Sequence, residues 1–300
     1  MKWKLVRVAM CLVVVTLLCC AAWAQAGGTP AQWKPVEAAL GRSGAMQPGD
    51  IIKFGMPRAE LHVKLGNVDI KPALALGSWA AFKAAGKGAM VMGDLVLTTD
   101  EVEPVMLKLE SGGIEITAVH NHLIGEMPRI VYMHIDGRGD AAKLAQTLHD
   151  AVALTGTPAP SSAPAPPAPA FDTAEIAKIL GHAGNMNGGV FQVGVPRAEK
   201  ITDQGVEVPP SMGVATGLNF QPTGKGRAAI TGDFVLLGSE VNPVIRTLRQ
   251  NGIAVTALHS HMLMEQPRLF FMHFWAEGDA AHLAHGLRAA LDQTNSVKPK

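Results

Sequence analysis

Aromatic residues are scarce in this chain of 300 residues, at 5% of the sequence. Surfaces that stack on nucleic-acid bases are therefore not expected. An excess of one charge is also missing, because Lys and Arg number 26 while Asp and Glu number 25. Without a basic excess or a long basic run, electrostatics gives no reason to expect binding to nucleic acid.

Cysteine is absent after residue 20, since Cys11, Cys19 and Cys20 are the three in the chain. If the N-terminal segment is removed, the mature protein has no disulfide, no thiolate nucleophile and no Cys ligand for a metal. Any metal site must then use His, Asp, Glu, Met or backbone groups. Leu18 precedes Cys19 where a lipidation site needs a small residue, so a lipid anchor is the less favoured interpretation.

Residues 1–26 have the pattern of a signal peptide. Lys2, Lys4 and Arg7 form a positive start, and an apolar run covers residues 8–22. The sequence AWA at 22–24 matches a signal-peptidase site. The apolar run is short for a membrane span, which needs about 20 residues. We therefore predict a periplasmic or secreted protein with no stable membrane span after cleavage, and a retained N-terminal anchor is the open alternative.

The remaining sequence contains one unit twice. TAVHNH at 117–122 returns as TALHSH at 256–261, and the flanking residues repeat at the same spacing. A segment rich in Pro and Ala separates the copies, and its composition favours an extended, semi-rigid spacer. The predicted organisation is a signal peptide at 1–26, a first domain at 33–154, a linker at 155–170 and a second domain at 171–294.

Local patterns predict the same elements in both copies. In the first copy, residues 90–97 have the pattern of a buried strand and residues 104–109 that of a helix. Residues 114–122 alternate as in a strand, residues 129–135 form the next strand, and residues 140–153 form a helix. The order strand, helix, strand, strand, helix indicates an α+β fold. We expect each copy to be a sandwich in which helices pack on a mainly antiparallel sheet.

The His-x-His sequence in each copy is the main candidate for chemistry. His120 and His122 lie on one face of their strand, with Cα atoms about 7 Å apart, so both rings can reach one ion. Glu126 follows in the next loop and offers a carboxylate oxygen. The second copy repeats this set as His259, His261 and Glu265. Such a set suits zinc or iron, and nearby methionines also make copper a candidate.

The position of His134, and of its counterpart His273, depends on the strand register. A tight hairpin would place His134 opposite Ile116, about 13 Å from His120 and outside a metal site. A different register would bring it closer, and the sequence does not choose between the two.

Two aspartates and four arginines are further candidates for site residues. Asp94 and Asp233 each follow Gly at a strand start, and we expect them to serve a turn or a hydrogen bond more than a metal. Four arginines each follow Pro, and their forked guanidinium suits carboxylate or phosphate ligands, with a surface salt bridge as the alternative. These predicted ligand-binding residues are Arg58, Arg129, Arg197 and Arg268.

A set of short motifs resembles the LppY/LpqO family of exported bacterial proteins and lipoproteins, whose domain has no assigned function. The motifs of the first copy are GMPR at 55–58, GD at 93–94, TAVHNH at 117–122, PR at 128–129, His134 and GD at 139–140. The resemblance covers both copies and implies an extracytoplasmic protein. It implies no catalytic residues.

These observations predict an exported protein that binds a divalent metal ion or a small ligand in each copy. Two alternatives stay open. One is a periplasmic metalloenzyme that uses the same His and Glu residues. The other is a structural module, or one that binds a component of the envelope, in which the histidines are packed without a ligand. The sequence does not decide whether the copies act separately or hold one ligand together.

Overall fold

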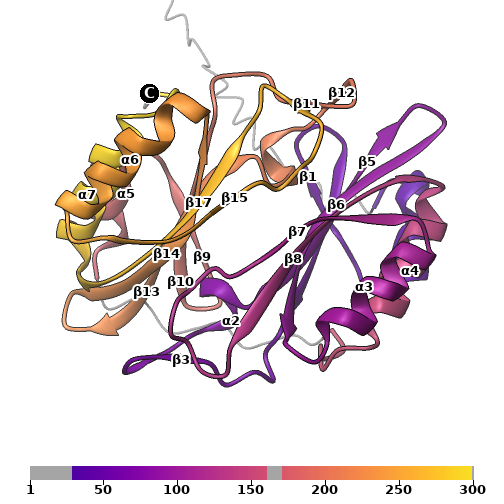
Figure 1. Cartoon of the computed structure of the whole chain (residues 1–300), viewed down its shortest axis with the longest axis horizontal. Helices are drawn as coiled ribbons and strands as arrows, with labels where there is room; N and C mark the ends of the chain where they lie inside the picture. The colour runs from indigo at the N-terminus through magenta and orange to yellow at the C-terminus, as the bar shows by residue number, and fades with distance from the viewer. Residues whose placement is uncertain (1–28, 161–170, 299–300) are drawn as a thin grey trace, which may run out of the picture.

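The computed structural model describes residues 29–160 and 171–298. The predicted signal peptide at 1–26 and most of the predicted linker lie outside the described residues. Within the described ranges, no helix is long and apolar enough to cross a membrane. Each repeat forms an α+β unit in which helices cover one face of an antiparallel sheet, which confirms the predicted fold class (Figure 1).

The first copy is built on a six-stranded sheet in the order β1-β2-β5-β6-β8-β7. Its strands are β1 (Ala45–Gln47), β2 (Ile51–Pro57), β5 (Gly77–Ala85), β6 (Gly88–Thr98), β7 (Ile114–His120) and β8 (Ile130–Gly139). Neighbouring strands are antiparallel throughout. The interior of β6 is buried along its length, as expected for a strand covered on both faces.

Three helices cover the outer face of this sheet. They are α1 (Lys34–Leu40), α3 (Val102–Ser111) and α4 (Ala141–Val152). Leu144 and Leu148 of α4 are four residues apart, so they share one side of the helix, and both are buried in the core. The carboxylate of Asp140 accepts a hydrogen bond from the backbone N–H of Lys143, which caps the start of α4.

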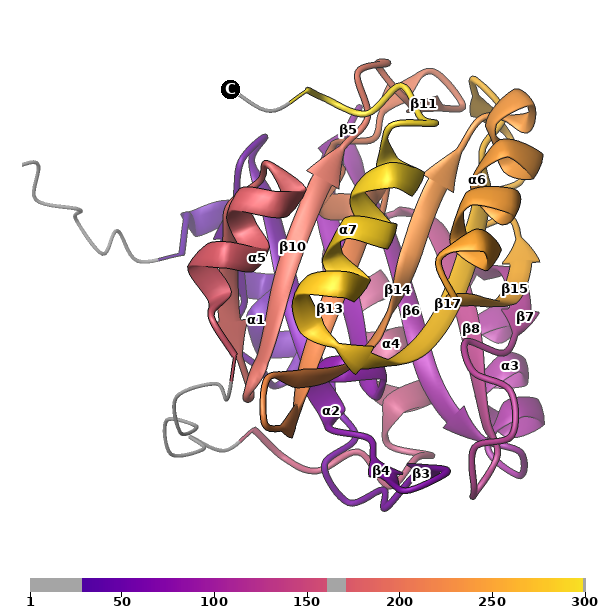
Figure 2. The same ribbon diagram turned by 90° about the vertical axis from the view of Figure 1, so that its left-hand side faces the viewer.

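The second copy repeats this arrangement with the sheet order β15-β17-β14-β13-β10-β9. Its strands are β9 (Gly184–Asn187), β10 (Val190–Pro196), β13 (Ala215–Gly224), β14 (Arg227–Leu236), β15 (Ala254–His259) and β17 (Phe270–Asp279). Its helices are α5 (Thr173–Leu180), α6 (Gly238–Gln250) and α7 (Ala280–Leu291), which lie over the outer face of the sheet in Figure 2.

Short elements fill the connections between the main strands. In the first copy these are the 3-10 helix η1 (Ala31–Trp33), β3 (Lys64–Leu65), β4 (Val68–Asp69) and α2 (Pro72–Ala75). In the second copy they are β11 (Thr202–Asp203), β12 (Val206–Glu207), η2 (Pro210–Met212) and β16 (Glu265–Gln266).

The hairpin between β7 and β8 does not have the tight register that would exclude His134. His134 pairs with Ala118, and His120 pairs with Tyr132. The observed pairs at Ala118 and His120 are displaced by two residues from the tight register, and a register shift between Ile116 and Ala118 accounts for one of the two, because an extra residue in one strand displaces all later pairs. His134 therefore lies on the same sheet face as His120 and close to it along the strand.

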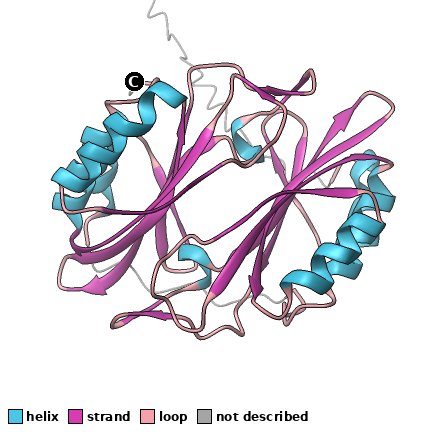
Figure 3. Ribbon diagram, in the orientation of Figure 1, coloured by secondary structure: helices cyan, strands magenta, loops and turns pink. Residues whose placement is uncertain are grey.

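The two sheets face each other, and the helices lie on the outside (Figures 1 and 3). Buried residues of both copies form common apolar clusters between the sheets, such as Met90 and Met92 with Val235 and Phe271. The order of layers is therefore helices, sheet, sheet and helices. The two copies share part of their core, so they pack together and are not independent domains joined only by a linker.

Hydrogen bonds cross between the copies in a nearly two-fold pattern. The hydroxyl of Thr117 donates to the carbonyl oxygen of His261, and the hydroxyl of Thr256 donates to that of His122. The side-chain amide of Asn121 also donates to the carbonyl oxygen of Thr256. These contacts join the ends of β7 and β15, where the His-x-His sequences lie.

Candidate metal centre

Six histidines meet between the two sheets, three from each copy. In the first copy, β7 ends at His120, the chain beyond it carries His122, and β8 carries His134. The counterparts in the second copy are His259, His261 and His273. The sequence predicts one site in each copy, whereas the structure brings the two sets into one cluster.

Rings from opposite copies lie against one another. The ring centroids of His120 and His259 are 3.5 Å apart. Those of His122 and His273 are 3.7 Å apart, as are those of His134 and His261. Each first-copy ring is thus paired with a second-copy ring, and the cluster exists only when both copies are present.

Two aspartates complete the cluster. Asp94 of β6 pairs with His134 in the sheet, and Asp233 of β14 pairs with His273. The Asp94 carboxylate lies 3.6 Å from Nε2 of His122, and the Asp233 carboxylate lies 3.1 Å from Nε2 of His261. A turn role was expected for both aspartates. They lie instead inside β6 and β14, and the order of strands in the sheet places both beside the histidines.

Four sets of three or more side chains within this cluster have ligand atoms all within 4.8 Å of one another. Two sets stay within one copy, and two combine residues of both copies. They are Asp94, His122 and His134; Asp233, His259, His261 and His273; His120, His122 and His273; and His120, His134 and His259. This spacing is compatible with ligands around a common ion, since each nitrogen would lie about 2 Å from it.

Hydrogen bonds fix the tautomer of three rings. Nδ1 of His120 lies 3.0 Å from the carbonyl oxygen of Asn121, and Nδ1 of His273 lies 2.7 Å from that of Gly232. His259 makes the matching contact with Ser260 at 3.3 Å. A carbonyl oxygen only accepts, so Nδ1 carries the proton and Nε2 keeps its lone pair. Metal-binding histidines are oriented in this way.

The Nε2 lone pairs of these three rings have no hydrogen-bond partner within the described residues. Nε2 of all six histidines is buried and makes no hydrogen bond within the described residues, and the same holds for one oxygen of Asp94 and one of Asp233. Leaving a buried acceptor unpaired costs about 1–3 kcal/mol. A concentration of such atoms at one place indicates that a ligand or ion belongs there.

Burial keeps these rings neutral at physiological pH. It lowers the pKa of His120 and of His259 to about 4, and that of His273 to about 3. It also lowers the pKa of His122, His134 and His261 well below the ordinary value. Neutral imidazole is the form that coordinates a metal, so no proton has to be removed before an ion binds.

The carboxylates respond to burial in the opposite direction. Burial, followed by the negative charge of Asp233, raises the pKa of Asp94 well above its usual range. Burial also raises the pKa of Asp233. A cation between the two groups would reverse this shift, because it stabilises the ionised carboxylates.

Glu126 and Glu265, the expected oxygen ligands, belong to none of these sets. Each carboxylate instead holds its own loop, accepting a hydrogen bond from the backbone N–H of Ile130 or of Leu269. Glu265 also pairs with Arg268 at 3.2 Å. The structure therefore places aspartates of neighbouring strands, and not these glutamates, with the histidines.

Arg58 and Arg197 are buried and already engaged. Arg58 is 1% exposed and donates to Glu60, Glu101 and the carbonyl oxygen of Val96. Arg197 makes the corresponding contacts in the second copy with Glu199, Glu240 and Val235. Both side chains therefore have a structural role and offer no donor fork to a ligand.

The other two arginines lie near the surface. Arg129 is exposed. Arg268 is half exposed and donates to Ser260 and to the backbone of its own loop. The four arginines therefore do not converge on one ligand site.

An aromatic wall closes the cluster on both sides. The ring of Tyr132 stacks on His122 with centroids 3.3 Å apart, and Phe271 stacks on His261 at 3.5 Å. The Tyr132 hydroxyl donates to the carbonyl oxygen of Ala75 and so turns away from the histidines. These stacks hold the rings of His122 and His261 in place.

Comparisons with known proteins point to a family without an assigned function. The family described as Domain of Unknown Function (DUF1259) matches residues 34–154 and 174–293. Comparison with curated proteins gives no match. The chain thus carries the family's domain twice, and each match contains three of the clustered histidines.

Two solved structures give long but weak alignments. A trimeric bacterial microcompartment shell protein, PduB, is 13% identical over 85% of this chain and 95% of its own, with a TM-score of 0.21. EtuB from Clostridium kluyveri is 8% identical over 83% and 90%, with a TM-score of 0.19. Scores this low carry no argument about this protein. The family match is extensive, and the chain belongs to the family described as Domain of Unknown Function (DUF1259), of which it holds two copies.

Proposed function

We propose that this protein binds divalent metal ions in one centre shared by its two copies. The observation that carries the proposal is the set of buried Nε2 atoms, which converge without hydrogen-bond partners within the described residues. Packed histidines without a ligand would leave these acceptors unpaired at a cost of about 1–3 kcal/mol each. Coordination would use the same lone pairs.

We infer one ion for each copy, because the centre has two matching halves. The halves are Asp94, His122 and His134, and Asp233, His261 and His273. His120 and His259 lie against each other between them. Nitrogen ligands with one carboxylate suit zinc, iron or copper, and the donor set alone does not choose among these.

Metal binding is favoured over catalysis as the role of this centre. Two pockets of the described residues, with volumes of about 370 and 560 Å³, are lined by none of the clustered histidines. A catalytic metal needs an open position that substrate can reach. A protein that stores, carries or is stabilised by metal needs no such opening.

Elemental analysis of the full chain, purified without a metal-affinity tag, tests the proposal. We expect about two equivalents of one metal per chain. A variant with His134→Ala and His273→Ala should lose most of it. The matched control changes two exposed histidines instead, His282→Ala and His285→Ala, and should keep the wild-type metal content.

Circular dichroism of each variant shows whether the fold survives. If the wild type holds no metal after reconstitution with zinc, iron and copper, the proposal fails. It fails equally if the folded His134→Ala and His273→Ala variant keeps its metal.

We also infer that the chain is exported as an LppY/LpqO-like protein, on the basis of the N-terminal pattern and motifs described above. A small ligand or a component of the envelope is then the class of partner to expect. Mass spectrometry of protein from the periplasm or medium should find a chain that begins near residue 25 or 27. Intact protein confined to the cytoplasm would contradict export.

A further inference from the structure

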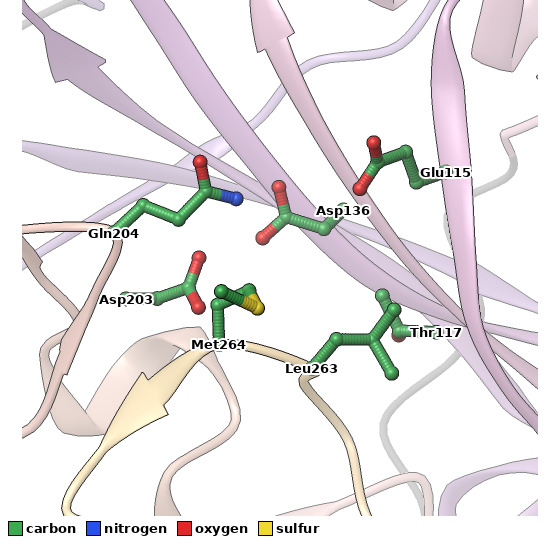
Figure 4. Close-up of a pocket in the computed structure, with 7 residues that line it drawn as sticks. All are labelled: Glu115, Thr117, Asp136, Asp203, Gln204, Leu263 and Met264. Atoms are coloured by element: carbon green, nitrogen blue, oxygen red, sulfur yellow. The ribbon is translucent and has the colours of Figure 1, made fainter.

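A pocket of about 370 Å³ opens between the two copies (Figure 4). Glu115 and Asp136 of the first copy line it together with Asp203, Leu263 and Met264 of the second. Figure 4 shows Asp136 between Glu115 and Asp203. Three acidic side chains therefore face one space.

Asp136 is a buried residue of this pocket with one unpaired carboxylate oxygen. It is 6% exposed, and its Oδ2 atom is buried with no hydrogen-bond partner in the described residues. The nearby guanidinium of Arg138 donates to Asp203, while its Nε lies 3.8 Å from Oδ1 of Asp136. One guanidinium thus lies beside the carboxyl groups of Asp136 and Asp203. Glu115 adds a third carboxyl group to the lining, so the pocket has an uncompensated negative charge when all three are ionised.

The lining identifies the class of cation. In the part of the chain that the structure describes, these carboxylates do not form a set with oxygens within 4.8 Å of one another, so a metal ion is disfavoured. No aromatic ring lines the pocket, so a cage for quaternary ammonium is disfavoured too. Leu263 and Met264 are 53% and 62% exposed and offer apolar surface to an alkyl chain.

We propose that this pocket binds a primary ammonium ligand that carries a short alkyl chain. The ammonium group donates to the unpaired carboxylate oxygen of Asp136 and to Glu115, and the alkyl chain packs on Leu263 and Met264. A compact ammonium has three donors and so matches separate carboxylates better than a planar guanidinium does. This site is independent of the metal centre.

The repeat supports a specific role for this lining. Ala254 and Trp275 of the second copy stand where the first copy has Glu115 and Asp136. Trp275 packs against an apolar cluster there. The acidic pair is therefore not a requirement of the shared fold, which accommodates apolar residues at the same two positions.

Calorimetric titration of the full chain with pentylammonium tests the proposal. It is carried out at pH 8, at which an alkylammonium keeps its positive charge. We expect saturable binding that weakens with added salt. Pentanol, which has the same chain without the charge, should bind at least about tenfold more weakly.

The isosteric variant Asp136→Asn should also weaken pentylammonium binding about tenfold or more, while metal content and unfolding temperature stay unchanged. The matched control Glu277→Gln removes an exposed carboxylate of the second copy and should bind as the wild type does. No binding up to about 10 mM pentylammonium, or equal affinity in the Asp136→Asn variant, would overturn the proposal.

Discussion

The neutral histidines make the stability of the metal-free protein depend on pH. Burial lowers the pKa of His120 and His259 to about 4, while an unfolded histidine titrates near 6.5. Between these values the unfolded chain binds more protons, so the free energy of unfolding rises with pH. We expect stability to fall as pH decreases from about 6.5 to 4, by up to about 1.4 kcal/mol per pH unit for each such histidine.

Urea titrations of chelator-treated protein at several pH values measure this slope. The His134→Ala and His273→Ala variant has two fewer shifted groups and should show a shallower slope. A free energy of unfolding that does not change across this window would contradict the assignment of neutral, buried rings.

Strand periodicity alone places His120 and His122 on one side of the chain, so this pair could be predicted from the sequence. Asp94 could not. It follows Gly93, which has an ordinary local explanation as a turn, so nothing nearby in the sequence marks it as a candidate ligand. Only the strand order β6-β8-β7 brings it to His134. Residues from neighbouring strands depend on pairings that periodicity does not reveal.

Arg58 illustrates the cost of breaking a buried ion pair. Its guanidinium is 1% exposed and bonds to Glu101 and to the carbonyl oxygen of Val96. Replacing it in Arg58→Met would leave these partners unpaired, and we expect a loss of about 3–5 kcal/mol in the free energy of unfolding. Arg129→Met, at an exposed position after a similar Pro, should change it by no more than about 0.5 kcal/mol.

Urea denaturation of both variants provides the comparison. If Arg58→Met were as stable as Arg129→Met, the Arg58 contacts would not hold the first copy together.

At the scale of elements, the helix at residues 140–153 and the strands around the histidines could be predicted from caps and alternation. The register of the β7–β8 hairpin could not. Its shift between Ile116 and Ala118 accompanies a hydrogen bond from Thr117 to the other copy. A contact between segments so distant in sequence leaves no local pattern. The sequence therefore predicts neither the register of this hairpin nor the full set of residues in the cluster.

Close approach of β5 and β6 depends on Gly93. A Cβ added at this residue would lie 2.6 Å from the carbonyl oxygen of Trp79 and 3.2 Å from a side-chain carbon of Ile135. Since backbone yields little, we expect Gly93→Ala to reduce the free energy of unfolding by about 1–3 kcal/mol.

Gly55 offers the control, because a Cβ added there meets nothing within 4 Å. Gly55→Ala should leave thermal stability unchanged or raise it slightly. Equal melting temperatures for the two variants would argue against tight packing at Gly93.

At the scale of the whole molecule, the repeat predicted two copies of one fold but not their joint centre. Each copy buries apolar residues against its partner, including Met90 against the second sheet and Phe271 against the first. In the sequence these residues cannot be distinguished from ordinary core positions, because a buried strand has the same apolar pattern whichever layer covers it.

This packing predicts that the linker is not needed to keep the copies together once they have folded. A protease site inserted between residues 155 and 170 should allow cleavage into two fragments that still elute as one species in size-exclusion chromatography. The metal content should persist. Fragments that separate, or that release the metal on cleavage, would show that the shared core is too weak to act alone.

The covalent connection has a consequence for dilution. A centre built from two identical subunits falls apart when protein concentration drops below the dissociation constant. Here the partner surfaces belong to one chain, so each half meets the other at an effective concentration set by the linker, independent of how many molecules surround it. One copy of the repeat can also change without the other, as Asp136 in the first copy and Trp275 at the matching position of the second illustrate. A single chain can therefore keep a two-sided histidine cluster complete and carry a one-sided acidic pocket as well.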